Sequence, residues 1–231
     1  MIPAKFLSKI GIHELEIEGV KVKAIHVTDN TSVIDQRIDQ LKASLNEQRP
    51  VVGIYVMVTV NQKQQSQTSN DLLIIYGGNC CLVIRLSNLV KFPSSIYNLL
   101  ADKNICFVGF GIYSKVGSLD LLNPKSSPYA VEYLSLDNVA EVGQLAARVL
   151  KKPNLSKCGL EELDKEIRQT VTDSEANVAT SLPGTGAGPA ACPNWKAMVF
   201  SDEEIKYAIH DAYTSCVIGD KLLGNLDAVN F

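Results

Sequence analysis

The sequence predicts an α/β fold in which helices cover a mixed β-sheet, and three observations support this prediction. Residues 14–28 alternate apolar and polar side chains on both sides of Gly19, which is the two-residue period of a hairpin exposed on one face. Residues 51–60 are apolar almost without interruption and rich in β-branched side chains, as expected of a central strand covered on both faces. Later segments repeat apolar side chains at helical spacing, so helices should pack on the faces of this sheet.

The elements of the first half can be placed from their flanking residues. A helix is expected from Ser32 to about Asn46, with Ser32 and Asp35 as its capping box. The remaining expected elements, in order, are a polar loop at 61–70, strands at 71–76 and 80–86 joined by a Gly-Gly-Asn turn, a helix from Pro93 to about Ala101, and a buried strand at 105–110. Three strands in close succession favour a sheet built around the 51–60 strand.

The second half is expected to be mainly helical. Its predicted helices cover 114–122, 138–150, 159–170 and 201–223, and Ser201 with Glu204 forms a capping box for the last of them. Residues 171–194 combine Pro, Gly, Ala and Ser with little to bury, which predicts a flexible surface loop. The chain is therefore interpreted as one domain, residues 1–231, with this loop inserted.

Composition limits the class of protein. The formal net charge is −3, and no cluster of Lys and Arg offers the electrostatic basis for tight nucleic-acid binding. Six cysteines lack metal-ligand spacing, which favours reduced thiols in an intracellular protein of the cytoplasm or nucleus. The apolar run at 51–60 is too short for a membrane helix, which needs about 20 residues, so no membrane association is expected.

Three segments, residues 78–119, 159–163 and 194–223, resemble the plant Werner-syndrome-like 3′–5′ exonuclease domains, which belong to the DnaQ-like branch of the ribonuclease H-like superfamily. The most specific stretches are FVGFGI at 107–112 and the run from Trp195 to Tyr213. The resemblance implies a ribonuclease H-like fold with a mixed central sheet, in agreement with the elements predicted above. It also implies a homo-oligomer, a hexamer in some relatives.

In that family four carboxylates hold two divalent cations, which activate a water and stabilise the leaving oxygen. The first two acids stand two residues apart on the central strand, and the resemblance places Tyr55 and Met57 at their positions. Lys115 stands at the position of the third acid. Asp211 matches the fourth, and Tyr207, four residues earlier on the same helix face, matches its tyrosine partner. One of the four acids is therefore retained.

These substitutions predict the loss of the Mg²⁺ or Mn²⁺ site, and no metal or other cofactor is expected. Mg²⁺ prefers oxygen ligands near octahedral geometry, which a phenol, a thioether and an ammonium do not supply. A like charge about 4 Å away costs about 4 kcal/mol at an effective dielectric of 20, so Lys115 also opposes a metal. Lys115 either pairs with Asp211 or is solvated, while Tyr55 and Met57 either fill space or line a new pocket. His210 is expected to point away from Asp211.

Three hypotheses about function follow. The first is a degenerate exonuclease-like protein, a pseudoenzyme that binds single-stranded nucleic acid or a protein partner. The second reuses the former active site for metal-free chemistry on a small molecule, with Lys115, Asp211, Tyr207 and Tyr55 as acid, base and hydrogen-bond donors. The third is residual 3′–5′ exonuclease activity, with ligands from another subunit or from Asp173 and Glu175 in the 171–194 loop.

Overall fold

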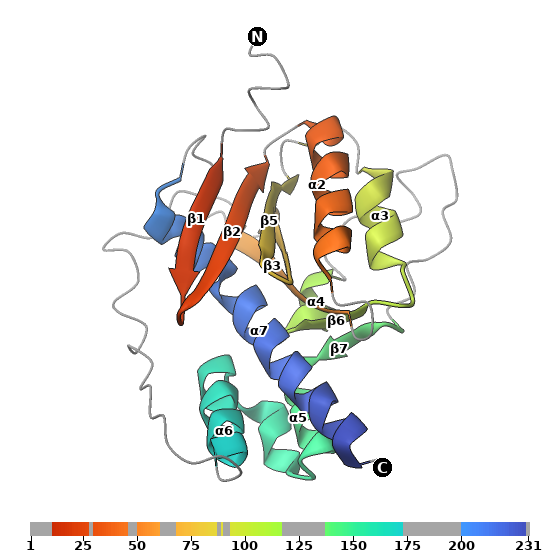
Figure 1. Cartoon of the computed structure of the whole chain (residues 1–231), viewed down its shortest axis with the longest axis vertical. Coiled ribbons are helices and arrows are strands. Elements are labelled where there is room, and N and C mark those ends of the chain that lie inside the picture. Colours follow the sequence, from red (N-terminus) through yellow and green to blue (C-terminus); the bar gives the residue numbers. More distant parts are fainter. Residues whose placement is uncertain are drawn as a thin grey trace.

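A computed structural model of the chain describes residues 11–27, 30–45, 50–60, 68–86, 89, 93–116, 137–172 and 200–229. Seven strands form one mixed sheet: β1 (Ile12–Ile17), β2 (Val20–Val27), β3 (Val51–Val60), β4 (Thr68–Gly77), β5 (Cys80–Arg85), β6 (Cys106–Gly109) and β7 (Val139–Glu141). Their order across the sheet is β1-β2-β5-β4-β3-β6-β7. The helices are α2 (Thr31–Ser44), α3 (Ser94–Leu100), α4 (Ile112–Val116), α5 (Val142–Val149), the 3₁₀ helix η4 (Pro153–Lys157), α6 (Leu160–Thr172) and α7 (Asp202–Val229). Figure 1 shows α7 running past the sheet towards α5 and α6. The predicted α/β class is confirmed.

Strand β3 lies inside the sheet, antiparallel to β4 and parallel to β6. Because successive side chains of a strand point to opposite faces, its residues divide between two apolar clusters. Val52, Ile54 and Val56 pack with α2, α3 and α4 on one face. Tyr55 and Met57 pack against the cluster that contains α7 on the other face. The prediction that this strand is covered on both faces is confirmed. The prediction that it is the central strand is wrong, because β4 holds the middle position of the seven. Tyr55 and Met57, which the resemblance places at acid positions, share the α7 face.

Helix α7 crosses this face in direct contact with β3. A Cβ atom on Gly53 would lie 1.9 Å from the backbone oxygen of Ala212, so no other residue type fits there without moving the helix. Gly219 makes a similar close approach, since its Cβ would lie 2.9 Å from Val108. Because α7 touches β3 at this point, Asp211, which precedes Ala212 in the helix, lies level with Tyr55 on the strand.

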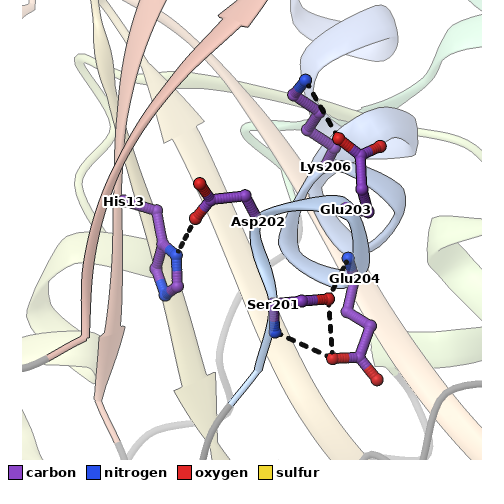
Figure 2. Close-up of polar contacts among 6 residues, drawn as sticks. All are labelled: His13, Ser201, Asp202, Glu203, Glu204 and Lys206. Atoms are coloured by element: carbon purple, nitrogen blue, oxygen red, sulfur yellow. Dashed lines mark hydrogen bonds and ion pairs between the residues drawn. The ribbon is translucent and has the colours of Figure 1, made fainter.

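The β1–β2 hairpin extends one edge of the sheet and is fixed at both ends. Its turn has Glu18 at φ 52° and Gly19 at φ 78°, the left-handed pair that a two-residue hairpin turn requires. At the turn, Arg168 of α6 contacts the carboxylate of Glu18 at 2.6 Å and that of the buried Asp164 at 2.7 Å. At the other end, His13 Nδ1 lies 2.6 Å from Asp202 Oδ1 at the start of α7 (Figure 2). The predicted hairpin is confirmed.

The N-terminus of α7 has the predicted capping box. The Ser201 backbone N–H donates to Glu204 Oε2 at 2.8 Å, and the Glu204 N–H donates to Ser201 Oγ at 3.3 Å (Figure 2). This reciprocal pair satisfies two backbone donors that a helix start leaves without partners. The cap fixes where α7 begins. Among the described residues, no helix is both long and apolar enough to cross a membrane.

Several element boundaries differ from the predictions. The cap of α2 is Asn30, whose side chain accepts from the Val33 N–H at 3.2 Å, so the capping box predicted at Ser32 and Asp35 is wrong. Asparagine caps a helix start as well as serine does, and its position here starts the helix one residue earlier. Residues 68–70, predicted as loop, belong to β4 and pair with residues 58–60 beyond a bulge after Met57.

The helix predicted at 138–150 begins only at Val142, because residues 139–141 form the short strand β7 beside β6. Residues 139–141 form a strand because their backbone pairs with β6 at the edge of the sheet. The helical spacing of the local sequence does not reveal this pairing. The final part of the helix predicted at 114–122 and residues 173–194 of the predicted flexible loop lie outside the described residues. Residues 171–172, assigned to that loop, are the last turn of α6.

Candidate functional site

Four of the five predicted site residues meet in one group, which we call the Asp211 cluster: Asp211 and Tyr207 of α7, Tyr55 of β3 and Lys115 of α4. Asp211 and Tyr207 are one helical turn apart, so they share a face. The Tyr55 hydroxyl donates a hydrogen bond to the Asp211 carboxylate. Burial, followed by the charge and hydrogen bond of Asp211, raises the pKa of Tyr55 well above its ordinary value. Tyr55 is therefore a neutral donor to this carboxylate at any physiological pH.

Lys115 lies on the face of the Tyr55 ring. Its Nζ atom is 3.6 Å from the ring centroid, within the range of a cation–π interaction. The side chain is half-buried, and this burial lowers the pKa of Lys115, while the charges of Asp211 and Glu141 oppose the shift. The ammonium therefore lies over an aromatic ring within electrostatic range of two carboxylates, and the choice between pairing with Asp211 and solvation stays a prediction.

Glu141 is a carboxylate of this region that the sequence did not reveal. Its two oxygens accept hydrogen bonds from the backbone N–H groups of Gly111 at 2.8 Å and Ile112 at 2.9 Å, at the start of α4. These contacts fix the short helix that carries Lys115. Glu141 lies on β7, about 30 residues further along the chain, in a segment that the periodicity assigns to a helix. No spacing rule connects it to Lys115, since pairing of β6 with β7 creates the contact.

Met57, the fifth predicted site residue, lies on the same face of β3 as Tyr55 but takes a different role. It is partly buried and packs against the apolar cluster that includes α7. It stands opposite the fully buried Leu72 of β4. This packing favours the interpretation that Met57 fills space, as flexible methionine side chains readily do.

His210 contacts Asp211, so the expectation that it points away is wrong. Its Nδ1 atom lies 3.3 Å from Asp211 Oδ1. The hydrogen bond to Asp211 raises the pKa of His210, burial opposes this, and the charges of Asp211, Glu161 and Glu18 add to the increase. Although adjacent helix positions do not share a face, a short carboxylate can turn towards its neighbour along the chain. Asp211 thus accepts from Tyr55 and contacts His210 as well.

The substitution His210→Gln should make unfolding less dependent on pH. Because the folded-state pKa of His210 is raised, its protonation stabilises the fold below the unfolded value of about 6.5, and this contribution disappears as pH rises through the folded pKa. We expect the difference in unfolding free energy between wild type and variant to be largest below about pH 6.5 and to shrink as the pH rises above it, in urea titrations. In an Asp211→Asn background the same difference should lose most of its pH dependence. A difference that grows with pH would contradict this assignment.

The capacity for metal binding can be judged from the donors present. Across the part of the chain that the structure describes, no group of three or more His, Cys, Asp and Glu side chains is arranged to hold a metal ion. Of the two carboxylates near Lys115, Asp211 accepts from Tyr55, and Glu141 accepts from two backbone amides. The cluster offers hydrogen-bonding and acid–base groups in place of a set of charged oxygen ligands.

The seven-stranded mixed sheet, with α7 packed across β3, has the ribonuclease H-like architecture of the solved structures that match it. The exonuclease domain of Nibbler from Aedes aegypti matches with a TM-score of 0.59 and 14% identity over 95% of this chain and 94% of that domain. RNase D from Escherichia coli matches with a TM-score of 0.54 and 14% identity over 88% of this chain and 45% of that protein. The EXD2 exonuclease domain is 22% identical over 87% of this chain and 88% of that domain, with a TM-score of 0.45.

No protein-family model matches the chain, and no curated protein sequence matches it. At the identities found, the likeness to Nibbler and RNase D shows the fold. The predicted ribonuclease H-like architecture is therefore confirmed, and the closer resemblance to the plant Werner-syndrome-like branch stays a prediction.

Proposed function

We propose that this chain is a degenerate 3′–5′ exonuclease-like protein that lacks metal-dependent nuclease activity and acts by binding a partner. The single observation that carries the proposal is the position of Lys115, whose ammonium lies 3.6 Å from the centre of the Tyr55 ring and close enough to Asp211 to feel its charge. A fixed cation thus occupies the region in which the resemblance expects divalent ions.

Charge arithmetic supports this proposal. In the family's site, four carboxylates carry four negative charges and two divalent ions carry four positive charges, so the loaded site is neutral. In this chain the family positions hold one carboxylate, Asp211, and one ammonium, Lys115, which are neutral together without a metal. A divalent ion about 4 Å from Lys115 would meet a repulsion of about 8 kcal/mol at an effective dielectric of 20, twice the value for two unit charges.

Single-stranded nucleic acid is the partner that the fold favours. RNase D, which shares the fold, is described as an exoribonuclease involved in structured RNA processing. Retention of Asp211 and Tyr207 on one face of α7 keeps the surface on which such a strand end would lie. A protein partner and a homo-oligomer, a hexamer by resemblance, stay predictions, and light scattering coupled to size-exclusion chromatography measures the second.

A second candidate function is metal-free chemistry on a small molecule. The observation in its favour is the combination of Lys115, whose pKa is lowered by burial, with a Tyr55 hydroxyl hydrogen-bonded to Asp211. An amine, a phenol and a carboxylate in contact are the groups that proton transfer needs. The exposed phenol of Tyr207 would be a further donor at the edge of this group.

The proposal predicts binding without cleavage. A 5′-labelled single strand of RNA or DNA should keep its length in Mg²⁺, Mn²⁺ or EDTA, and native gels should show the same retardation in all three, because no divalent ion takes part. Asp202→Asn, which alters another carboxylate of α7, is the control for Asp211→Asn. Shortening from the 3′ end that requires a divalent ion and is abolished by Asp211→Asn alone would overturn the proposal and support residual exonuclease activity. No retardation with either nucleic acid would leave a protein partner or the small-molecule chemistry.

A further inference from the structure

The Asp211 cluster has an exposed aromatic ring at its edge. Tyr207 is 52% exposed, the largest exposure among the large apolar and aromatic side chains of the described residues. It lies close enough to Tyr55 to raise the pKa of that phenol. Asp211, on the same face of α7, is itself 34% exposed. A ligand can therefore reach the ring of Tyr207 and the polar groups of the cluster from solvent at the same time.

The charges around this ring are mainly negative. The first turn of α7, just before Tyr207, contains Asp202, Glu203 and Glu204. Lys206 is adjacent to Tyr207, but its ammonium contacts Glu203 at 3.4 Å (Figure 2). Within the Asp211 cluster, the negative charges of Asp211 and Glu141 act on the ammonium of Lys115.

This arrangement disfavours an anionic ligand. A phosphate close to Tyr207 would meet carboxylates that repel it and lysines whose charge is already offset. A flat, uncharged, hydrogen-bonding group would instead gain stacking energy from the ring, since every nucleobase has a π-face that stacks on tyrosine. The polar atoms of Asp211, His210 and Tyr207 can exchange hydrogen bonds with the edge of such a group or with a sugar hydroxyl.

We propose that Tyr207 is a stacking platform for a nucleobase, so that the Asp211 cluster recognises the base and sugar of a single-stranded nucleic acid and not its phosphate. This inference rests on the proposed function, which supplies the class of ligand, and adds how the ligand is held. Recognition is then independent of divalent ions and nearly independent of salt, unlike nucleic-acid binding through phosphate contacts.

The affinity of a short 5′-labelled single strand, measured by fluorescence anisotropy in EDTA, tests the role of the ring. Tyr207→Ala should weaken binding about 5- to 150-fold, the range for loss of one base–aromatic stack. Tyr207→Phe keeps the ring and should restore most of the affinity. Tyr113→Ala is the matched control, because Tyr113 is also exposed, at 45%, but its hydroxyl donates to the Val139 backbone oxygen outside the cluster. It should bind as wild type does. Equal losses in the Tyr207→Ala and Tyr113→Ala variants would overturn the proposal.

The salt dependence tests the absence of phosphate recognition. In a plot of the logarithm of the binding constant against the logarithm of salt concentration, each phosphate neutralised by the protein adds about 0.7 to the downward slope. We therefore expect a slope smaller than about 0.7, which corresponds to fewer than one neutralised phosphate. A 3′-phosphate on the strand should not improve binding. A steep slope, or a gain from the 3′-phosphate, would overturn this inference while leaving binding without cleavage intact. Divalent-dependent shortening of the strand would instead overturn the proposed function. Absence of any binding would overturn this inference and leave a protein partner for the proposed function.

Discussion

The triple variant Tyr55→Asp, Met57→Glu, Lys115→Asp should bind Mn²⁺, whereas the wild-type protein should not. The three changes return carboxylates to the family's positions and remove the ammonium that lies over the Tyr55 ring. Tyr55 and Met57 share the face of β3 against which α7 packs, so their replacements would face Asp211. Oxygen ligands on three elements would then surround the space beside α7, as a two-metal site requires.

Thermal unfolding measures this gain directly. Without metal the variant should be less stable than wild type by several kcal/mol, because each pair of carboxylates about 4 Å apart repels by about 4 kcal/mol at an effective dielectric of 20. Free Mn²⁺ at 100 times its dissociation constant returns about 2.7 kcal/mol per site, and each kcal/mol raises the Tm of a chain of this size by about 2–4 °C. We therefore expect a Tm increase of about 11–22 °C for two sites, against none in wild type.

The control is the same triple variant with Asp211→Asn, which keeps the new carboxylates but removes the retained one. Its Tm should respond to Mn²⁺ far less, since the ligand from α7 is missing. A wild-type Tm that rises with Mn²⁺ as much as that of the variant would contradict the loss of the metal site. A variant that folds and does not respond to Mn²⁺ would contradict the placement of Tyr55, Met57 and Lys115 around one site.

The substitution Gly53→Ala should lower the unfolding free energy by at least about 3 kcal/mol or prevent soluble expression. An added methyl group that overlaps backbone atoms is more destabilising than one that overlaps a side chain, because the backbone cannot rotate away. The added Cβ would lie 1.9 Å from the Ala212 backbone oxygen and 2.9 Å from Cys216 Cβ. Neither α7 nor β3 can move without disturbing the core on that face of the sheet. Urea unfolding followed by circular dichroism measures the change.

Gly159→Ala is the matched control for this variant. Its Cβ meets no atom within 4 Å, and its backbone is outside the left-handed region. It precedes α6, where glycine is a modestly better helix cap than alanine, so a loss below about 1 kcal/mol is expected. Comparable losses at Gly53 and Gly159 would show that α7 does not pack against β3 as closely as described.

Local sequence patterns were sufficient to predict elements whose structure depends only on residues within the same segment. The alternation around Gly19, the apolar run of β3 and the capping box of α7 each depend on residues close together in the chain, and each prediction was confirmed. Apart from the local choice of Asn30 as the cap of α2, the errors in the elements fall where a distant partner decides. Residues 139–141 are a strand because β6 lies beside them, and residues 68–70 extend β4 because β3 continues past its bulge.

The candidate site divides in the same way. Tyr207 and Asp211 could be assigned to one face from their spacing alone, since a helix fixes the angle between them. His210 and Glu141 could not, because their roles depend on a side-chain rotation and on a contact between β7 and the start of α4.

The amino-acid sequence by itself determined the α/β class and the apolar strand at 51–60, because periodicity is a property of the chain. Only the tertiary structure decided that Lys115 lies on the ring of Tyr55, that Tyr55 donates to Asp211 and that Glu141 holds the helix beneath Lys115. These contacts join β3, α4, β7 and α7, and their geometry comes from the packing of the sheet against its helices, which no local pattern contains.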